Sequence, residues 1–325
     1  MVKASAFDIC RHDSYMGFSI APNLSGEMPS KSNGNLSPES SIKVTTDSSG
    51  YRESFHPIIG NHHQMKVQIY GGSWAWGAHV DVNQTYSSVL RQEASNAHIS
   101  NLSCPSHSIY QSELRLKKAI HNNQIPDLIL LEVHPWSICR SIQPYIDSGY
   151  LRPILVPRSK NNPYIFQMPS LARYKNIRLC MVSYLKYIKN RSQSRLKINS
   201  SAFNTVNDPL YSNSLNSYYQ KALDTTYYNA MRFCEVAKSI SSRVVLLVMP
   251  DFEWPETESS PSPIEDKVYS QISKLQSIYR HVEILNIRYI DGHPNPSEDN
   301  FMRHPTAEYH KRISHAVLSH SSFWK

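Results

Sequence analysis

Apolar residues fall into two patterns that alternate along this chain. Short apolar stretches that contain Val, Ile or Leu predict strands at 65–70, 97–102, 128–133, 243–249 and 282–287. Between them, apolar residues recur every three or four positions, which predicts helices at about 84–93, 114–120 and 217–239. Two further helices are expected, one that ends at about 280 and one that begins after 305. Strands and helices that alternate in this way form βαβ units. We therefore expect a five-stranded, mainly parallel sheet whose functional residues gather at the carboxyl ends of the strands.

Two parts of the chain fall outside this alternation. Residues 1 to about 60 are rich in Ser, Pro, Asn and Gly, so we expect an extended lead-in ahead of a domain spanning 61–325. Within the lead-in, Ile42–Thr46 alternates like an edge strand, and we expect Arg52, after the following turn, to anchor the segment against the body. From about 139 to 213 the pattern breaks down, which predicts an insertion.

The predicted insertion has parts of its own. Apolar stretches at 151–157 and 164–168 flank a polar Ser-Lys-Asn-Asn segment, which predicts a small hairpin. A basic helix from about 171 to 189 and a polar loop from about 190 to 213 are expected to follow. We expect this insertion to cover the functional site.

Composition indicates a globular protein. The 325 residues, 40% of them hydrophobic, are enough for a large core. No run of about 18 apolar residues occurs, so we expect no membrane-spanning helix. The first residues lack the apolar core of a signal peptide. The five cysteines form no C-x-x-C pair, which favours a reducing, cytoplasmic setting over a disulfide framework: Cys10, Cys104, Cys139, Cys180 and Cys234.

The charge of the chain does not point to a nucleic-acid partner. Its 34 Lys and Arg against 26 Asp and Glu give a formal charge of +8. The basic residues are spread between about Arg115 and Arg195 without a repeated basic-aromatic pattern, which favours a solvated surface. The histidines include no H-E-x-x-H motif and no cluster with metal-ligand spacing, so we expect neither a metal nor a cofactor.

The strand at 65–70 ends in a turn that suits a nucleophile. Gly71 and Gly72 allow a sharp turn, and Ser73 follows them at the strand end. Glycine also leaves room beside the hydroxyl for an incoming carbonyl group, while the amides after the turn point into the same space. An ordinary strand-to-helix turn that happens to hold serine is the alternative.

A histidine near the end of the chain is the candidate base. His304 stands directly before Pro305, which suits a first helical turn, and the helix that follows has an apolar face. A histidine in this loop is well placed to reach back across the sheet to Ser73. The rival is His293, in Asp291-Gly292-His293-Pro294, but a loop follows it instead of a helix.

The order of these parts resembles the SGNH, or GDSL-like, hydrolase family from about residue 42 to 320. Thr46–Arg52 (TDSSGYR) is similar to the T-N-S-x-G-[FY]-R that precedes the nucleophile block in one branch. Ile69–Gly77 (IYGGSWAWG) resembles G-D-S-x-x-x-G. Asn101–Gln111 resembles the second block, and His304–Thr306 resembles H-P-[NT]. The resemblance implies a flavodoxin-like three-layer α/β/α sandwich and ester hydrolysis or acyl transfer without a metal.

The resemblance also implies roles for individual residues. Ser73 would attack an ester carbonyl and His304 would accept its proton. The family's acid lies three residues before the histidine, where this chain has Phe301, so Asp299 becomes the expected acid, with Asp291 as the other candidate.

The oxyanion donors depart further from the family pattern. The Ser73 amide is one expected donor, and Ser106 stands where the family has a glycine whose amide is the second. The family's third donor, an asparagine after the third strand, is absent here. Trp136, His134 and Ser137 are the candidate replacements. Gly72 replaces the aspartate of G-D-S.

Three functions stay open on these residues. The first is an esterase that acts on O-acyl or acetyl esters of carbohydrates or small metabolites through Ser73 and His304. The second is an acyltransferase that uses the same serine, and the third is a ligand-binding protein that has lost hydrolysis. Trp74, Trp76 and Cys104, which flank the turn and the second block, are expected to pack and not to react.

Overall fold

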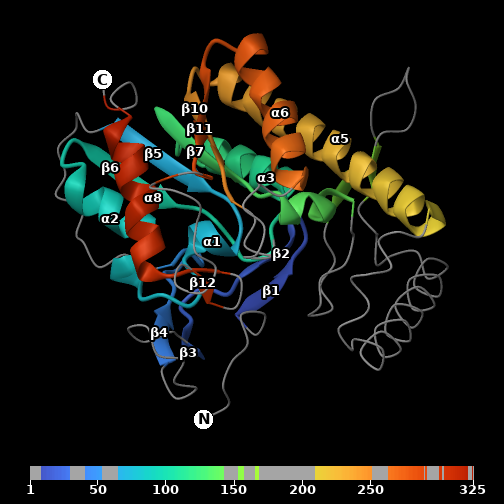
Figure 1. Ribbon diagram of the computed structural model, residues 1–325. Helices are drawn as coiled ribbons and strands as arrows, with labels where there is room; N and C mark the ends of the chain where they lie inside the picture. Colours follow the sequence, from blue (N-terminus) through green and yellow to red (C-terminus); the bar gives the residue numbers. More distant parts are fainter. Residues whose placement is uncertain are drawn as a thin grey trace.

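The fold is described from a computed structural model (Figure 1). It describes residues 9–29, 41–52, 65–142, 153–156, 165–167, 209–250, 263–288, 290, 300–301, 304–320 and 324. Among these residues, no helix combines the length and the apolar character that crossing a bilayer requires.

A five-stranded parallel sheet forms the centre of the molecule. Its strands are β5 (Met65–Tyr70), β6 (Ala97–Asn101), β7 (Leu128–Val133), β10 (Arg243–Val248) and β11 (Val282–Asn286). They lie in the order β11-β10-β7-β5-β6, and every neighbouring pair is parallel. Counted along the chain this is the order 2-1-3-4-5 of flavodoxin-like sheets, whose ligands bind where the strand order reverses. That reversal lies between β5 and β7, so the expected flavodoxin-like fold is confirmed.

Helices cover both faces of this sheet and complete a three-layer sandwich (Figure 1). One face packs against α3 (Ile109–His121), α5 (Pro209–Ser239) and α6 (Pro263–Ile278). The other face packs against α1 (Ser73–Trp76), α2 (Tyr86–Glu93) and α8 (Ala307–Ser319). Strand β7 shows how the sequence builds both interfaces: Ile129 and Leu131 join the first core, whereas Leu128 and Leu130 join the second.

Side-chain caps fix where three of these helices begin. Thr85, Ser108 and Thr306 accept hydrogen bonds from the backbone N–H groups of the first turns of α2, α3 and α8. Asp81 caps the short 3-10 helix η1 (Val82–Gln84). The cap at Thr306 matters most for function, because it fixes the chain direction directly after His304.

The N-terminal stretch contains more regular structure than the expected lead-in with one edge strand. Strand β1 (Cys10–Asp13) pairs with β2 (Gly17–Ile20), and β3 (Ser25–Pro29) pairs with β4 (Ser41–Thr45). Their apolar side chains form one cluster with Trp76 and Cys104, next to the turn that follows β5. These short strands were not predicted, because loops that contain Gly, Asn and Pro interrupt their apolar residues.

Arg52 anchors the N-terminal stretch, as the sequence predicts. Its guanidinium donates hydrogen bonds to the carbonyl groups of Trp76, Gly77 and Val80, and it lies 4.8 Å from the centre of the Trp76 ring. Burial lowers the pKa of Arg52 to about 10, against the opposing effect of Asp81. The arginine therefore ties the chain before β5 to the turn after α1.

The predicted insertion is described in part. Strand β8 (Ile154–Val156) pairs antiparallel with β9 (Ile165–Gln167), so the expected hairpin is confirmed. The basic helix expected at 171–189 lies outside the described residues. The loop expected up to 213 is wrong over its last residues, because α5 already begins at Pro209, a residue that suits the first turn of a helix.

Candidate active site

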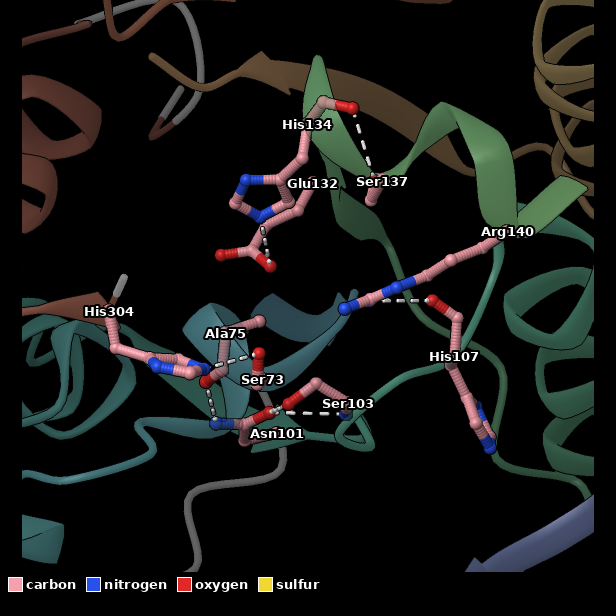
Figure 2. A network of polar contacts seen from close by, with 10 residues as sticks. All are labelled: Ser73, Ala75, Asn101, Ser103, His107, Glu132, His134, Ser137, Arg140 and His304. Carbon is pink, nitrogen blue, oxygen red and sulfur yellow. Dashed lines mark hydrogen bonds and ion pairs between the residues drawn. The ribbon is translucent and has the colours of Figure 1, made fainter. Parts of the chain in front are cut away.

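Ser73 lies on a sharp turn at the carboxyl end of β5. It is the first residue of α1, directly after Gly72, and its side chain points toward His304 (Figure 2). Gly77 ends this single helical turn in a left-handed conformation, with φ 78°. Ser73 is 6% exposed. The serine thus stands at the reversal of strand order, on a rigid and nearly enclosed turn.

His304 reaches Ser73 from the opposite end of the chain. Its Nε2 atom lies 2.8 Å from the Ser73 Oγ (Figure 2). His304 belongs to β13 (His304–Pro305), which pairs with β12 (Asn300–Phe301) just before α8. Its ring also contacts the ring of His79, with centroids 4.9 Å apart. The structure therefore brings together the two residues that the sequence singled out for proton transfer.

The expected acid cannot be placed in this geometry. Asp299, Asp291 and the rival His293 all lie outside the described residues. The backbone of Phe301, three positions before His304, pairs directly with His304 in the β12–β13 hairpin. Asp299 precedes this hairpin by one residue, and its role as the acid stays a prediction.

Ser106 has the backbone conformation of a glycine. Its φ is 64°, in the left-handed region that L residues rarely adopt. Hydrogen bonds fix the loop around it: the Cys104 N–H donates to the Gly71 carbonyl at 3.2 Å, and the His107 N–H donates to the Cys104 carbonyl at 3.1 Å. The replacement of glycine by serine therefore does not prevent the conformation expected of this loop.

Asn101 braces the same loop from the end of β6. Its Nδ2 donates to the Ala75 carbonyl at 2.7 Å, and its Oδ1 accepts from the Ser103 N–H at 3.1 Å (Figure 2). The amide thus links α1, which begins with the nucleophile candidate, to the loop that holds Ser106.

Cys104 is a packing residue, as expected. It is fully buried, and burial raises the pKa of its thiol well above the usual value. Trp74 and Trp76 are buried as well and belong to the cores on either side of the turn. None of the three is exposed to a substrate.

The polar side chains at the end of β7 and in the turn after it contact one another. The Nε2 atom of His134 lies 3.2 Å from the Glu132 Oε2, and both side chains are buried. The Ser137 hydroxyl donates to the His134 carbonyl at 3.1 Å. The His134 ring packs edge-on against Trp74, at 4.3 Å between centroids. Trp136 begins the 3-10 helix η2 (Trp136–Ser141), and its side chain lies outside the described part of the structure.

Arg140, in the same 3-10 helix, places a positive charge beside the nucleophile turn. Its Nη1 atom donates to the His107 carbonyl at 3.3 Å, and a Cβ atom built on Gly72 would lie 2.9 Å from it. In Figure 2 its side chain runs from η2 toward the region between Glu132 and the loop of Ser103 and His107. Burial lowers the pKa of Arg140 to about 10, while the Glu132 charge acts in the opposite direction, so the guanidinium is cationic at neutral pH.

Sequence reasoning missed three residues of this site: His79, Glu132 and Arg140. Glu132 did carry a readable signal, because a carboxylate inside the otherwise apolar run Leu128–Val133 requires a buried polar partner. Arg140 lies where the helical and strand patterns break down, and His79 follows Gly77 in a turn of irregular backbone. Neither position had a periodicity from which its direction could be predicted.

Within the described part of the chain, no group of three or more His, Cys, Asp or Glu side chains is arranged to hold a metal ion. The arrangement instead offers a hydroxyl and an imidazole in contact, with a guanidinium alongside, which is suited to nucleophilic chemistry on a polar carbonyl group.

Comparisons with known proteins give structural neighbours only. No protein-family model and no curated protein matches the sequence. The structure is similar to that of TesA, at 10% identity and a TM-score of 0.45 over 80% of this chain and 100% of that one. It is also similar to a GDSL-like lipase from Bacteroides thetaiotaomicron, at 12% identity and a TM-score of 0.40 over 78% of this chain and 86% of that one.

A third neighbour is the psychrotrophic esterase EstA from Pseudoalteromonas sp., at 11% identity and a TM-score of 0.40 over 80% of this chain and 97% of that one. Likenesses of this strength carry no conclusion about the chemistry of this chain. Its fold rests on the strand order of its own sheet, and its site on the contacts among its own residues.

Proposed function

We propose that this protein is a serine-dependent ester hydrolase that acts through an acyl-enzyme. Its substrates are O-acyl esters, such as acetyl esters, of carbohydrates or small metabolites. The observation that carries the proposal is the hydrogen bond between the Ser73 Oγ and the His304 Nε2, at 2.8 Å. A hydroxyl in contact with an imidazole is the arrangement that nucleophilic acyl chemistry requires.

The first half of the reaction acylates the serine. As the Ser73 Oγ attacks the ester carbonyl, its proton moves to the His304 Nε2. The tetrahedral intermediate then collapses, and the protonated imidazole gives that proton to the departing alkoxide. The alcohol leaves, and the acyl group stays on Ser73.

The second half regenerates the enzyme. His304 accepts a proton from a water molecule, which attacks the acyl-enzyme carbonyl. Collapse of the second tetrahedral intermediate releases the carboxylic acid and returns the proton to the Ser73 Oγ. One histidine thus serves as base and acid in turn, and no metal takes part in either half.

The surroundings of His304 support its role as a base. The β12–β13 hairpin and the helix cap at Thr306 hold the backbone on both sides of it, and the His79 ring packs against its imidazole. Asp299 is our candidate for the group that orients the imidazole and stabilises its charged form.

Hydrolysis of p-nitrophenyl acetate at neutral pH tests the proposal. The wild type is compared with Ser73→Ala and His304→Ala, and circular dichroism checks that all proteins fold alike. Ser319→Ala and His315→Ala are matched controls, because both residues lie on exposed positions of α8. Turnover by the wild type and the controls, with a loss of at least about 1,000-fold in the two site variants, supports the proposal. Equal rates for all five proteins would overturn it.

A further inference from the structure

The chemistry proposed for Ser73 requires a donor that the sequence did not supply. Attack on an ester carbonyl places a negative charge on its oxygen, and donors aimed at that oxygen stabilise the transition state. The Ser73 and Ser106 amides are candidates for two such donors. Of the replacements expected from sequence, His134 faces Glu132 and the Ser137 hydroxyl donates to a backbone carbonyl, whereas the Trp136 side chain lies outside the described residues.

The Arg140 guanidinium touches the neighbours of both amides. Its Nη1 atom donates to the carbonyl of His107, the residue after Ser106, at 3.3 Å. The same atom lies beside Gly72, the residue before Ser73, at 2.9 Å from where a Cβ would be. The guanidinium therefore bridges the nucleophile turn and the second loop.

The charge and geometry of Arg140 suit an oxyanion. A guanidinium is planar and carries five N–H donors, a geometry that matches oxygen acceptors. Hydrogen bonds from an ionised donor are shorter and stronger than those from a neutral amide, and more so in a site that excludes water. A charge-assisted donor of this kind serves an oxygen that gains negative charge during the reaction.

Glu132 explains how a cation is held in this buried position. Its carboxylate is buried at the end of β7 and contacts both Gly71 and His134. The Glu132 charge favours the charged form of Arg140. The Glu132 charge thus opposes the effect of burial on the guanidinium, and Gly72, which lacks a side chain, leaves room for it.

We propose that Arg140 is a catalytic residue that donates a hydrogen bond to the oxyanion formed when Ser73 attacks an ester. This inference rests on the proposed function. It differs from a purely structural role, in which Arg140 would only tie η2 to the loop of His107. The two roles predict different kinetics, because an oxyanion donor stabilises the transition state more than the bound substrate.

Steady-state kinetics on p-nitrophenyl acetate separate the two roles. Arg140→Met and Arg140→Lys are compared with the wild type and with Arg91→Met, a control in which the arginine donates to a single carbonyl on the edge strand β6. We expect Arg140→Met to lower kcat by about 100- to 1,000-fold with KM changed by less than about threefold. Arg140→Lys keeps the charge without the planar fork and is expected to lie between. Arg91→Met should retain wild-type kinetics.

Chemical rescue separates the two roles further, in a third variant, Arg140→Ala, which leaves space for a free guanidinium ion. Guanidinium at millimolar concentration should raise the kcat of Arg140→Ala several-fold and leave the kcat of Arg91→Met unchanged. If Arg140 had only a structural role, no such increase is expected. Wild-type kcat in a folded Arg140→Met, or a loss confined to KM, would overturn the assignment. If Arg140→Met does not fold, Arg140→Lys is the deciding variant. A kcat equal to that of the wild type in Arg140→Lys would also contradict the catalytic role of Arg140.

Labelling of Ser73 by a fluorophosphonate separates failure of this inference from failure of the proposed function. A wild type that neither labels nor hydrolyses esters contradicts both. A wild type that does both, beside an Arg140→Met variant that is its equal, contradicts the role of Arg140 alone.

Discussion

The Nη1 atom of Arg140 lies where a side chain at Gly72 would begin, 2.9 Å from the position of its Cβ. The backbone of Gly72, with φ −94°, does not itself demand glycine. A side chain at this position would instead have to displace the guanidinium of Arg140. The absence of a side chain at position 72 and the place of the Arg140 guanidinium are therefore two parts of one arrangement.

This relationship predicts the effect of Gly72→Ala. The added methyl group displaces the far end of a flexible side chain, so we expect a change of less than about 1 kcal/mol in the free energy of unfolding. Ester hydrolysis should fall at least about tenfold, because Arg140 moves away from Ser73. Gly26→Ala is the matched control, since nothing lies within 4 Å of the added Cβ. Unchanged hydrolysis in Gly72→Ala would contradict the arrangement.

The left-handed backbone of Ser106 leads to a second prediction. A non-glycine residue in this conformation costs about 1 kcal/mol, and what the site needs from position 106 is its backbone N–H. Ser106→Gly should therefore keep hydrolysis within about threefold of wild type. Ser106→Val, whose branched side chain opposes a positive φ, should lower both the melting temperature and the rate. A large loss in Ser106→Gly would assign a role to the hydroxyl instead.

Arg52 is expected to be among the residues most important for stability. Its guanidinium binds three backbone carbonyls, and the methionine of Arg52→Met offers no donor to them. We expect the free energy of unfolding to fall by at least about 3 kcal/mol, because buried carbonyls lose a charged donor. Urea unfolding of this variant beside Arg91→Met measures the difference. Equal losses in both would contradict an anchoring role.

His310 makes stability depend on pH in a defined direction. It is fully buried against Tyr86, and burial, with Arg52 and His304 nearby, lowers its pKa to about 3. In the unfolded chain it binds a proton below about pH 6.5, which the folded protein does not, so stability falls as the pH drops. Between pH 7 and pH 5 we expect this histidine alone to remove about 2 kcal/mol.

Urea unfolding at pH 7 and pH 5 tests this, with His310→Asn as the comparison. Asparagine keeps an acceptor for the Tyr86 N–H, which donates to the His310 Nδ1 at 3.3 Å, but does not titrate. The variant should lose less stability than the wild type on acidification. The same pH dependence in both proteins would show that His310 is not the group responsible.

The sequence was sufficient for the sheet because β7 and β10 are nearly continuous apolar runs and the other three strands keep apolar residues at alternate positions. The ends of the five predicted strands lie within one residue of the observed ends. The short strands β1 to β3 were missed because four or five residues between turns show too little alternation. The early start of α5 was missed because its first turns are rich in Asn and Ser.

The site was predictable only where chemistry and turn type coincide. Ser73 follows two glycines and His304 precedes a capped helix, so both could be chosen and then found in contact. Arg140 could not be chosen, because its proposed role depends on its contact with Gly72, some 70 residues away. Such a relationship appears only once the chain is folded.

Covalent labelling of Ser73 tests the central claim most directly. The folded protein is treated with a fluorophosphonate, and the modified residue is identified by mass spectrometry of its peptides. The account predicts one label per chain, on Ser73, absent in Ser73→Ala and at least about 100-fold slower in His304→Ala, where no base accepts the proton. A folded wild type that takes up no label, or takes it up on another residue, would contradict the account.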